Sequence, residues 1–198
     1  MATYKSIKYD VDYGGKAGAL IPIATTTVSS GTATVNFTSG IDSTYDNYLI
    51  IYNNVHQATD GEKFTFQGTT DGSNFNVTMT STVWYTYSTE PSGGGGQSTT
   101  YHTGSDQAQA TGYQPLNAGG GGNGNDECCA GWIKLYNPSS TTYVKQFLAR
   151  QSNYQDSDYS NDGHVAGYFN TTSAITGISF KFGSGNIDAG TFQLFGVH

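Results

Sequence analysis

Charged residues are scarce in this sequence. They make up 12% of the 198 positions, about half of the share found in average soluble proteins. The eight Lys and Arg are spread along the whole chain and the formal net charge is −7, so no basic patch is available to neutralise phosphates. We therefore expect no binding to nucleic acid.

Long apolar runs are missing as well. No stretch approaches the roughly 20 apolar residues that a membrane-spanning helix requires, which predicts no insertion into a membrane. The first ten residues, MATYKSIKYD, contain no hydrophobic core of a secretion signal. We therefore expect a protein that is not exported.

Residues that carry chemistry are few and scattered. The two cysteines, Cys128 and Cys129, follow Asp126 and Glu127, but no second cysteine pair or nearby histidine completes a metal-binding pattern. Free thiols are the expected state in a chain that is not exported. The four histidines have no nucleophile motif beside them. We predict no catalytic residue, no cofactor and no metal ion, and hence a protein that is not an enzyme.

Strand patterning is what the sequence contains in abundance. Near the end of the chain, Ile178, Phe180 and Phe182 alternate with polar residues, so the three apolar side chains share one face of a strand. Turn residues at 183–186 precede a second strand over 191–197, which predicts a closing hairpin. Further strands are predicted at 23–28, 32–38, 47–55, 64–66, 74–87, 130–136, 142–151 and 165–171.

About ten strands without a convincing helix predict an all-β fold. The expected architecture is a jelly-roll-like antiparallel β-sandwich that forms a single domain over 22–198. Two glycine-rich stretches near 91–125 surround a segment with weak patterning, so long loops are expected there. A polar loop is expected over 153–163.

The N-terminal segment, 1–21, interleaves Lys and Tyr and has too little apolar surface for a core of its own. It is either the first edge strand of the same domain or a short arm that docks onto a neighbouring protein. The candidate assembly residues in the arm are Tyr4, Lys5, Ile7, Lys8 and Tyr9.

Aromatic residues flank the first glycine-rich stretch. Aromatic rings near loops can stack on sugars, although in β-proteins they also pack within sheets and interfaces. Both interpretations stay open for four candidate glycan contacts, Trp84, Tyr85, Tyr87 and Tyr101.

An acidic segment raises the question of calcium. From Asp158 the pattern D-x-S-x-D-G matches the first six positions of an EF-hand loop, but Phe169 stands where the bidentate carboxylate is required. A solvated acidic loop is therefore expected, with a loop-type calcium site as the alternative.

Several stretches resemble a known family. They are FTSGIDSTYDNYLIIYNNV at 37–55, TTDGS at 69–73, AGWIKLYNPSS at 130–140 and AITGISFKFGSGNIDAGTFQLFGV at 174–197. Together they are similar to small virion structural proteins of tailed bacteriophages, especially phages of marine cyanobacteria. Those proteins usually end in leucine-tyrosine-glycine, and Phe195 takes the place of the tyrosine here.

The resemblance implies a jelly-roll-like structural subunit of the virion, on the tail, on a fibre or as decoration of the capsid surface. Such a subunit assembles in the host cytoplasm and carries no catalytic residues. Its expected partners are other virion proteins and further copies of itself, and a trimer is the predicted homo-oligomer. The alternative function is a host-receptor or glycan-binding module that uses the loop aromatics.

Overall fold

The computed structural model describes residues 20–90 and 97–198. Within these ranges the chain has thirteen strands, one 3₁₀ turn and no α-helix, and all strand pairings are antiparallel. The predicted all-β class is therefore confirmed. The elements are β1 (Leu20–Val28), β2 (Val35–Phe37), β3 (Asn47–Gln57), β4 (Phe64–Thr69), β5 (Met79–Thr89), β6 (Gln97–Tyr101), η1 (Thr103–Ser105), β7 (Ala108–Ala110), β8 (Gln114–Pro115), β9 (Cys129–Tyr136), β10 (Lys145–Gln155), β11 (Tyr159–Phe169), β12 (Gly177–Phe182) and β13 (Ile187–Val197).

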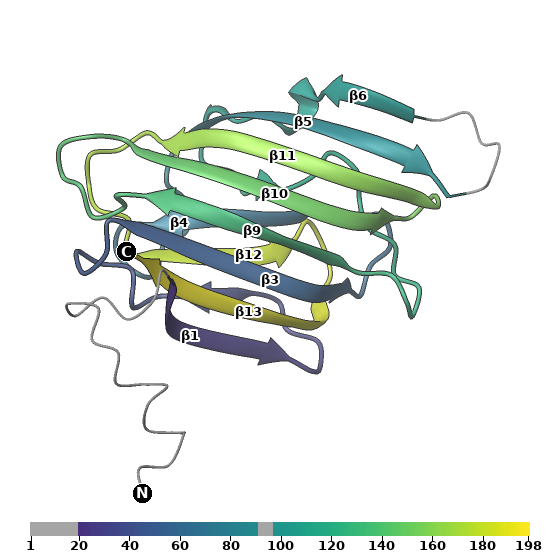
Figure 1. Cartoon of the computed structure of the whole chain (residues 1–198), viewed down its shortest axis with the longest axis horizontal. Helices are drawn as coiled ribbons and strands as arrows, with labels where there is room; N and C mark the ends of the chain where they lie inside the picture. Colours follow the sequence, from purple (N-terminus) through teal and green to yellow (C-terminus); the bar gives the residue numbers. More distant parts are fainter. Residues whose placement is uncertain (1–19, 91–96) are drawn as a thin grey trace, which may run out of the picture.

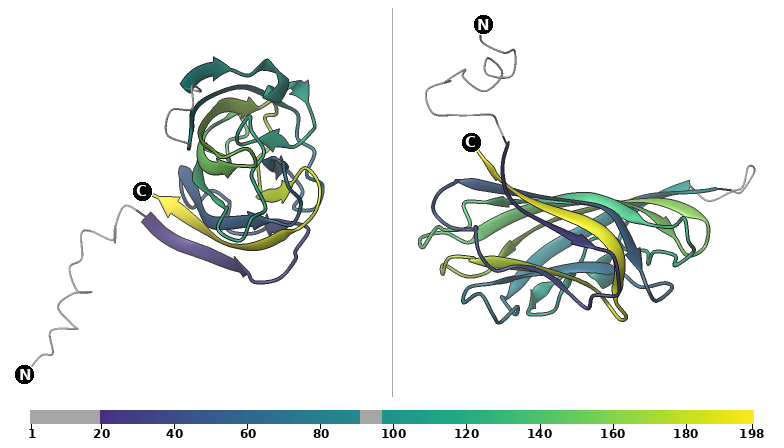
Figure 2. Two further views of the ribbon diagram at one scale, coloured as in Figure 1. Left: turned by 90° about the vertical axis from the view of Figure 1, so that its right-hand side faces the viewer. Right: turned by 90° about the horizontal axis from the view of Figure 1, so that it is seen from below.

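The described strands form two sheets of unequal size. The larger has nine strands in the order β1-β13-β3-β9-β10-β11-β5-β6, with the short β7 also paired to β5 (Figure 1). The smaller has four strands in the order β2-β12-β4-β8. Figure 2 shows the smaller sheet lying against one face of the larger one, which confirms the predicted β-sandwich.

The chain passes back and forth between the two sheets. In the larger sheet β1 pairs with β13 and β3 pairs with β9. In the smaller sheet β2 pairs with β12 and β4 pairs with β8. Strands from the beginning and the end of the chain therefore lie side by side in both sheets. The remaining long strands, β10, β11, β5 and β6, extend the larger sheet on one side.

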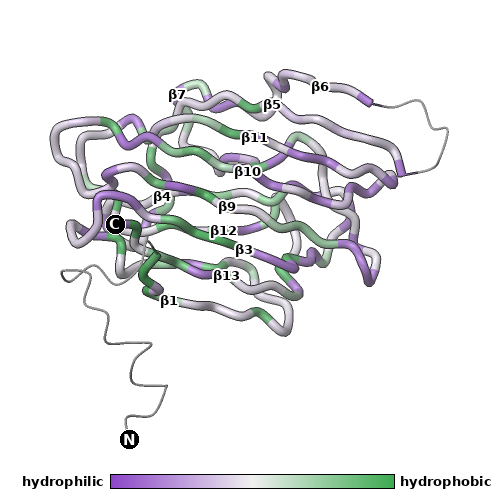
Figure 3. Tube along the Cα trace, viewed as in Figure 1, coloured by the Kyte–Doolittle hydropathy of each residue, from purple (hydrophilic) through white to green (hydrophobic). Residues whose placement is uncertain are grey.

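Alternation along each strand explains why the sheets pack on one face. In β10, Phe147 and Ala149 are buried, whereas Leu148 and Arg150 between them are exposed. Because successive side chains of a strand point to opposite faces, this pattern turns one face of the larger sheet to the core and the other to solvent. Hydropathy changes accordingly within single strands in Figure 3.

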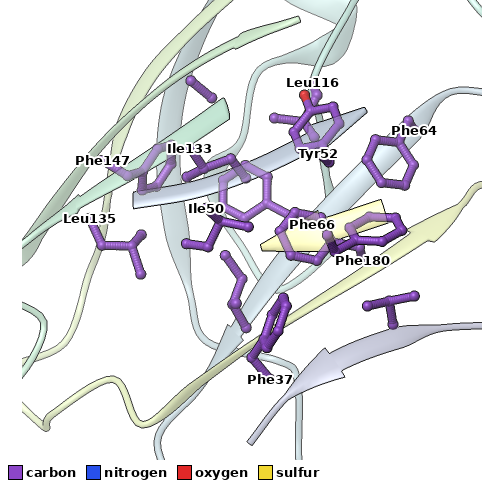
Figure 4. Close-up of a cluster of buried hydrophobic side chains, with 14 of the residues drawn as sticks. Phe37, Ile50, Tyr52, Phe64, Phe66, Leu116, Ile133, Leu135, Phe147 and Phe180 are labelled. Carbon is purple, nitrogen blue, oxygen red and sulfur yellow. The ribbon is translucent and has the colours of Figure 1, made fainter. Parts of the chain in front are cut away.

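Aromatic side chains fill the space between the sheets (Figure 4). The rings of Phe64 and Phe180 stack with centroids 5.8 Å apart, and Tyr52 meets Phe64 edge-on at 5.2 Å. The buried hydroxyl of Tyr52 donates a hydrogen bond to the side-chain oxygen of Gln151 at 3.2 Å. Burial raises the pKa of this phenol well above its ordinary value.

The predicted closing hairpin is wrong. β12 pairs with β2 and β4 in the smaller sheet, whereas β13 pairs with β1 and β3 in the larger one. The turn at 183–186 therefore carries the chain from one layer to the other. A period of two identifies a strand and its buried face, but it carries no information about which strand is the neighbour.

Two segments predicted as loops contain strands, which accounts for thirteen strands instead of about ten. The stretch near 91–125 includes β6, β7 and β8, and the stretch 153–163 is the tight end of the β10–β11 hairpin. The hairpin was hidden because its buried residues are polar. Asn153 and Asn161 lie inside, where Asn153 accepts a hydrogen bond from Asn117 at 2.5 Å and Asn161 donates one to Gln155 at 2.7 Å. The strand predicted over 74–87 begins later in the structure, where β5 starts at Met79.

Candidate functional site

The outer face of the larger sheet is the most distinctive surface of the described structure. The smaller sheet covers the opposite, inner face, and no described segment forms a layer over the outer one. Three large side chains on this outer face, Trp84, Trp132 and Leu148, are 41%, 37% and 41% exposed. Large apolar side chains in the open mark candidate contact surfaces.

The strand register aligns five of the outer residues in one line across the sheet. Trp132 of β9 pairs with Arg150 of β10, and Arg150 pairs with His164 of β11. His164 in turn pairs with Trp84 of β5, which pairs with Tyr101 of β6. We refer to these five residues as the aromatic row. Within the row, Arg150 and His164 lie between Trp132 at one end and Trp84 and Tyr101 at the other.

Polar contacts hold the middle of the aromatic row in place. Arg150 donates two hydrogen bonds to the carboxylate of Asp162, from Nε at 2.8 Å and from Nη2 at 2.7 Å. Nε2 of His164 lies 3.2 Å from the same carboxylate. The hydrogen bonds from Arg150 lower the pKa of Asp162 below its ordinary value of 3.8, with a further contribution from His164 against the opposing effect of partial burial. The pKa of the guanidinium is raised in return by its hydrogen bonds to Asp162.

Ring stacking orders the next position of the row. The indole of Trp84 and the imidazole of His164 are nearly parallel, with centroids 3.9 Å apart and planes inclined by 6°. At the end of the row the hydroxyl of Tyr101 donates a hydrogen bond to Asp106, which raises the pKa of the phenol. The rings of Trp84 and Tyr101 are therefore held by neighbouring side chains before any ligand arrives.

Two shallow depressions flank the aromatic row, and Asp162 contributes to both. The first is lined by Ala130, Gly131, Trp132, Arg150, Ser152 and Asp162. The second is lined by Thr86, Tyr87, Ser88, Gln97, Ser98, Thr99, Ser160 and Asp162. Hydroxyl and amide groups dominate the second depression, so this surface offers many neutral hydrogen-bond donors and acceptors beside flat aromatic rings.

The structure separates the four predicted glycan residues into two pairs. Trp84 and Tyr101 are cross-strand neighbours on the outer face. Tyr85 and Tyr87 project to the inner face because they alternate with Trp84 along β5. There they are half-buried, with Tyr85 stacked on Tyr87 at 5.9 Å and Tyr87 meeting Tyr159 edge-on at 5.4 Å. This second pair packs against its own fold.

Three residues of the site were not singled out from the sequence: Trp132, Arg150 and His164. Asp162 was considered only as part of the acidic pattern that begins at Asp158. A signal existed for two of them, because the predicted strands 130–136 and 142–151 place Trp132 and Arg150 at polar, alternating positions. No local signal places His164 beside Trp84, since their strands are far apart in the sequence and meet only through the register of β11 with β5.

The other half of the outer face is apolar. Phe195 of β13 pairs with both Pro22 of β1 and Leu49 of β3, and Ile51 follows Leu49 on the same face. Leu148 lies on the far side of Lys134, which pairs with both Leu49 and Leu148. We call Pro22, Leu49, Ile51, Leu148 and Phe195 the apolar half. All five remain partly or fully exposed.

The aspartates of the acidic segment are divided between a turn and a strand. Asp156 and Asp158 lie in the turn between β10 and β11, whereas Asp162 lies within β11 and is engaged by Arg150. Among the described residues no group of three or more His, Cys, Asp or Glu side chains is arranged to hold a metal ion. The hydroxyl of Tyr154 donates hydrogen bonds to Glu90 and Asp158, and its bond to Glu90 is the main cause that raises its pKa.

Both cysteines are free thiols, as expected, with Cys128 exposed and Cys129 buried. Burial raises the pKa of the Cys129 thiol. The five candidate assembly residues of the arm, Tyr4, Lys5, Ile7, Lys8 and Tyr9, lie outside the described residues. The predicted end of the arm at residue 21 falls within β1, which begins at Leu20.

Comparison with known proteins adds no relative: no protein-family model, curated protein or solved structure matches the chain. In the part of the chain that the structure describes, no helix is long and apolar enough to cross a membrane.

Proposed function

We propose that this protein is a non-enzymatic structural subunit of a tailed bacteriophage particle, on the tail, a fibre or the capsid surface, where it assembles with copies of itself and with other particle proteins. The observation that carries the proposal is the apolar half, a part of the sheet face that no segment within 20–90 and 97–198 covers, on an otherwise well-packed sandwich. The resemblance of four sequence stretches to small virion proteins supplies the phage context.

The strand pairings support a jelly-roll core. Eight strands in chain order, β1, β2, β3, β4, β8, β9, β12 and β13, pair as first with last, second with seventh, third with sixth and fourth with fifth. This nested pairing is what a β-hairpin rolled into two sheets produces, and jelly rolls are common in virus particles. We call β10, β11, β5 and β6 the added strands, because they extend the larger sheet beyond the eight.

The apolar half lies mainly on this eight-stranded core. Because Pro22, Phe195 and Leu49 are contiguous across three paired strands, burial of this surface removes neighbouring apolar groups from water together. The occupant that we propose is a second copy of this chain. A low-charge, aromatic and apolar surface is the composition found at the centre of protein interfaces.

Strand β1 adds an edge beside the apolar half that no other described strand pairs with. It is an edge strand of the larger sheet and its sequence, LIPIATTTV, contains no charged residue. Charged side chains are a common protection of edge strands against pairing with another chain, and β1 has none. The arm predicted over 1–21 leads directly into this edge, so docking through the arm and burial of the apolar half would involve one side of the molecule.

Sedimentation of the purified chain tests the assembly. We expect a mass that is a multiple of the 21.0 kDa chain, with three copies as the predicted number. The Leu148→Asp variant should shift the mass toward one copy, and Thr82→Asp, which places the same charge on an exposed position of β5, should not. A single-copy mass at all concentrations would overturn self-assembly. Absence of the chain from purified particles of a phage that encodes it, measured by mass spectrometry, would overturn the virion role.

A further inference from the structure

We propose that the aromatic row is a binding site for a neutral polysaccharide, which lies across β9 and the added strands from Trp132 to Tyr101. This site goes beyond the structural role, since it occupies the polar half of the outer face rather than the apolar half. Its ligand class follows from three features of the row: the placement of its aromatic rings, their fixed orientation and the absence of uncompensated charge.

The aromatic placement is the first feature. The chain has two tryptophans, and both stand on the outer face in the same cross-strand row. Three strand steps separate Trp132 from Trp84, or about 14 Å at the usual spacing of paired strands. Tyr101, one step further, is 56% exposed. Planar rings that are exposed at intervals across the sheet can stack on successive sugar rings of a linked chain.

Fixed orientation is the second feature. Trp84 is stacked on His164, the imidazole contacts Asp162, and Asp162 is held by two hydrogen bonds from Arg150. Four side chains from β5, β10 and β11 thus brace one another on the solvent side of the sheet. Rings that are already ordered lose little conformational freedom when a ligand stacks on them, which favours binding.

The charge balance is the third feature, and it selects the ligand class. The one arginine of the row is paired with a carboxylate at 2.7 and 2.8 Å, so it presents its remaining N–H groups without an unpaired positive charge. The second depression adds the hydroxyl or amide groups of Thr86, Ser88, Gln97, Thr99 and Ser160. This inventory suits the many hydroxyls of a neutral sugar chain better than the carboxylates of an acidic one.

The position of the row in the fold is consistent with a function other than self-assembly. Apart from Trp132, its residues lie on the added strands, outside the eight strands that pair in nested order. The two surfaces meet where Ile51 of the apolar half pairs with Trp132, and from there the row extends away from the apolar half over the added strands. A repeated array of such sites would strengthen weak binding to a polysaccharide surface.

A glycan microarray with neutral hexose polymers (dextran and mannan) and an acidic polymer (alginate) tests the proposal. We expect retention on a neutral polymer, and calorimetry with that polymer should show affinity reduced about tenfold in Trp84→Ala and in Trp132→Ala. Tyr143→Ala is the matched control, because this tyrosine is 71% exposed and lies outside the row. Thermal melting and sedimentation of each variant separate loss of the site from loss of the fold or of assembly.

Three outcomes would overturn the proposal. One is no retention on either neutral polymer while the protein is folded and assembled. Another is binding confined to alginate and lost at high salt, which would indicate nonspecific charge attraction. The third is loss of self-association in Trp84→Ala, because it would assign the row to contact with a second copy rather than to a glycan.

Discussion

Trp84 and His164 lie face to face with ring centroids 3.9 Å apart, although the 79 residues from 85 to 163 separate them in the chain. Their contact exists because β5 and β11 pair in a register that places the two residues opposite each other. The imidazole is in turn fixed by Asp162 and Arg150. This stacked pair lies on the solvent side of the sheet, outside the core. The orientation of its rings is therefore fixed at a surface that a ligand can reach.

The first prediction concerns the carboxylate at the centre of the row. Asp162→Asn removes the charge that balances Arg150, so we expect weaker binding to the neutral polymer and stronger binding to alginate. Calorimetry with both polymers measures this change of preference. Because the ion pair is partly exposed, with 54% of the Arg150 side chain and 30% of the Asp162 side chain accessible, the melting temperature should change little. Equal losses for both polymers, with a lower melting temperature, would indicate damage to the fold instead.

The second prediction concerns acid. The pKa of Asp162 is lowered in the folded protein, chiefly by hydrogen bonds from Arg150. A carboxyl with a lowered pKa stabilises the fold above its unfolded value, near 3.8, and this contribution is lost as the pH falls through the folded value. Because the folded carboxyl stays ionised below that ordinary value, glycan binding should persist as the pH falls to 3.8 and decline only at lower pH. Titration by calorimetry checks the decline.

The carboxyl of Asp71 provides a control that distinguishes an effect of acid on the stability of the fold from an effect on the binding site. Asp71 accepts hydrogen bonds from the backbone N–H groups of Asn74 at 2.7 Å and Ser73 at 2.9 Å, and the bond from Asn74 is the main cause that lowers its pKa. This turn is remote from the aromatic row. Asp71→Asn should therefore reduce the acid sensitivity of thermal stability and leave the acid sensitivity of binding unchanged. If binding followed Asp71 instead, global unfolding would explain the decline.

The third prediction concerns close packing beneath the row. A Cβ atom at Gly131 would clash with the backbone oxygen of Arg150 and lie 2.8 Å from Cζ of Tyr52. Because backbone and a buried ring cannot move aside, Gly131→Ala should destabilise the protein by about 1–3 kcal/mol. Denaturant unfolding measures the change. Gly112→Ala, whose Cβ would meet Gln107 at an ordinary 3.6 Å, is the control and should unfold as the parent does.

The fourth prediction concerns the absence of chemistry. A binding surface without a reacting pair of carboxylates should leave its polysaccharide intact, because glycoside hydrolysis requires an acid and a base or nucleophile on either side of the bond. Prolonged incubation with dextran or mannan should release no new reducing ends. Release that disappears in Asp162→Asn would contradict the non-enzymatic assignment.

The sequence predicted the fold at the level of strands and layers. The strands predicted at 130–136 and 142–151 are present as the paired strands β9 and β10. Asn153 and Asn161 lie in strands although their segment was predicted as a loop. The prediction failed there because it relied on buried apolar residues, and these two buried residues are polar. Pairing across layers was equally hidden, as β12 and β13 demonstrate.

The candidate site was predictable in part for the same reason. Trp84 and Tyr101 could be chosen from their position beside a glycine-rich stretch. The predicted strand over 74–87 already placed Tyr85 and Tyr87 on the face opposite Trp84, but it did not show which face the second sheet covers. Arg150 and His164 enter the site through strand register, which depends on contacts distant in sequence. A row that crosses five strands has no signature in any one of them.

Fluorescence quenching of the two tryptophans tests the central claim most directly, because both lie on the outer face of the larger sheet. Acrylamide should quench the free protein readily. Addition of dextran or mannan, whichever the protein retains more strongly, should reduce this quenching and move the emission to shorter wavelength. Unchanged quenching at saturation with that polymer would show that it binds elsewhere and would contradict the account.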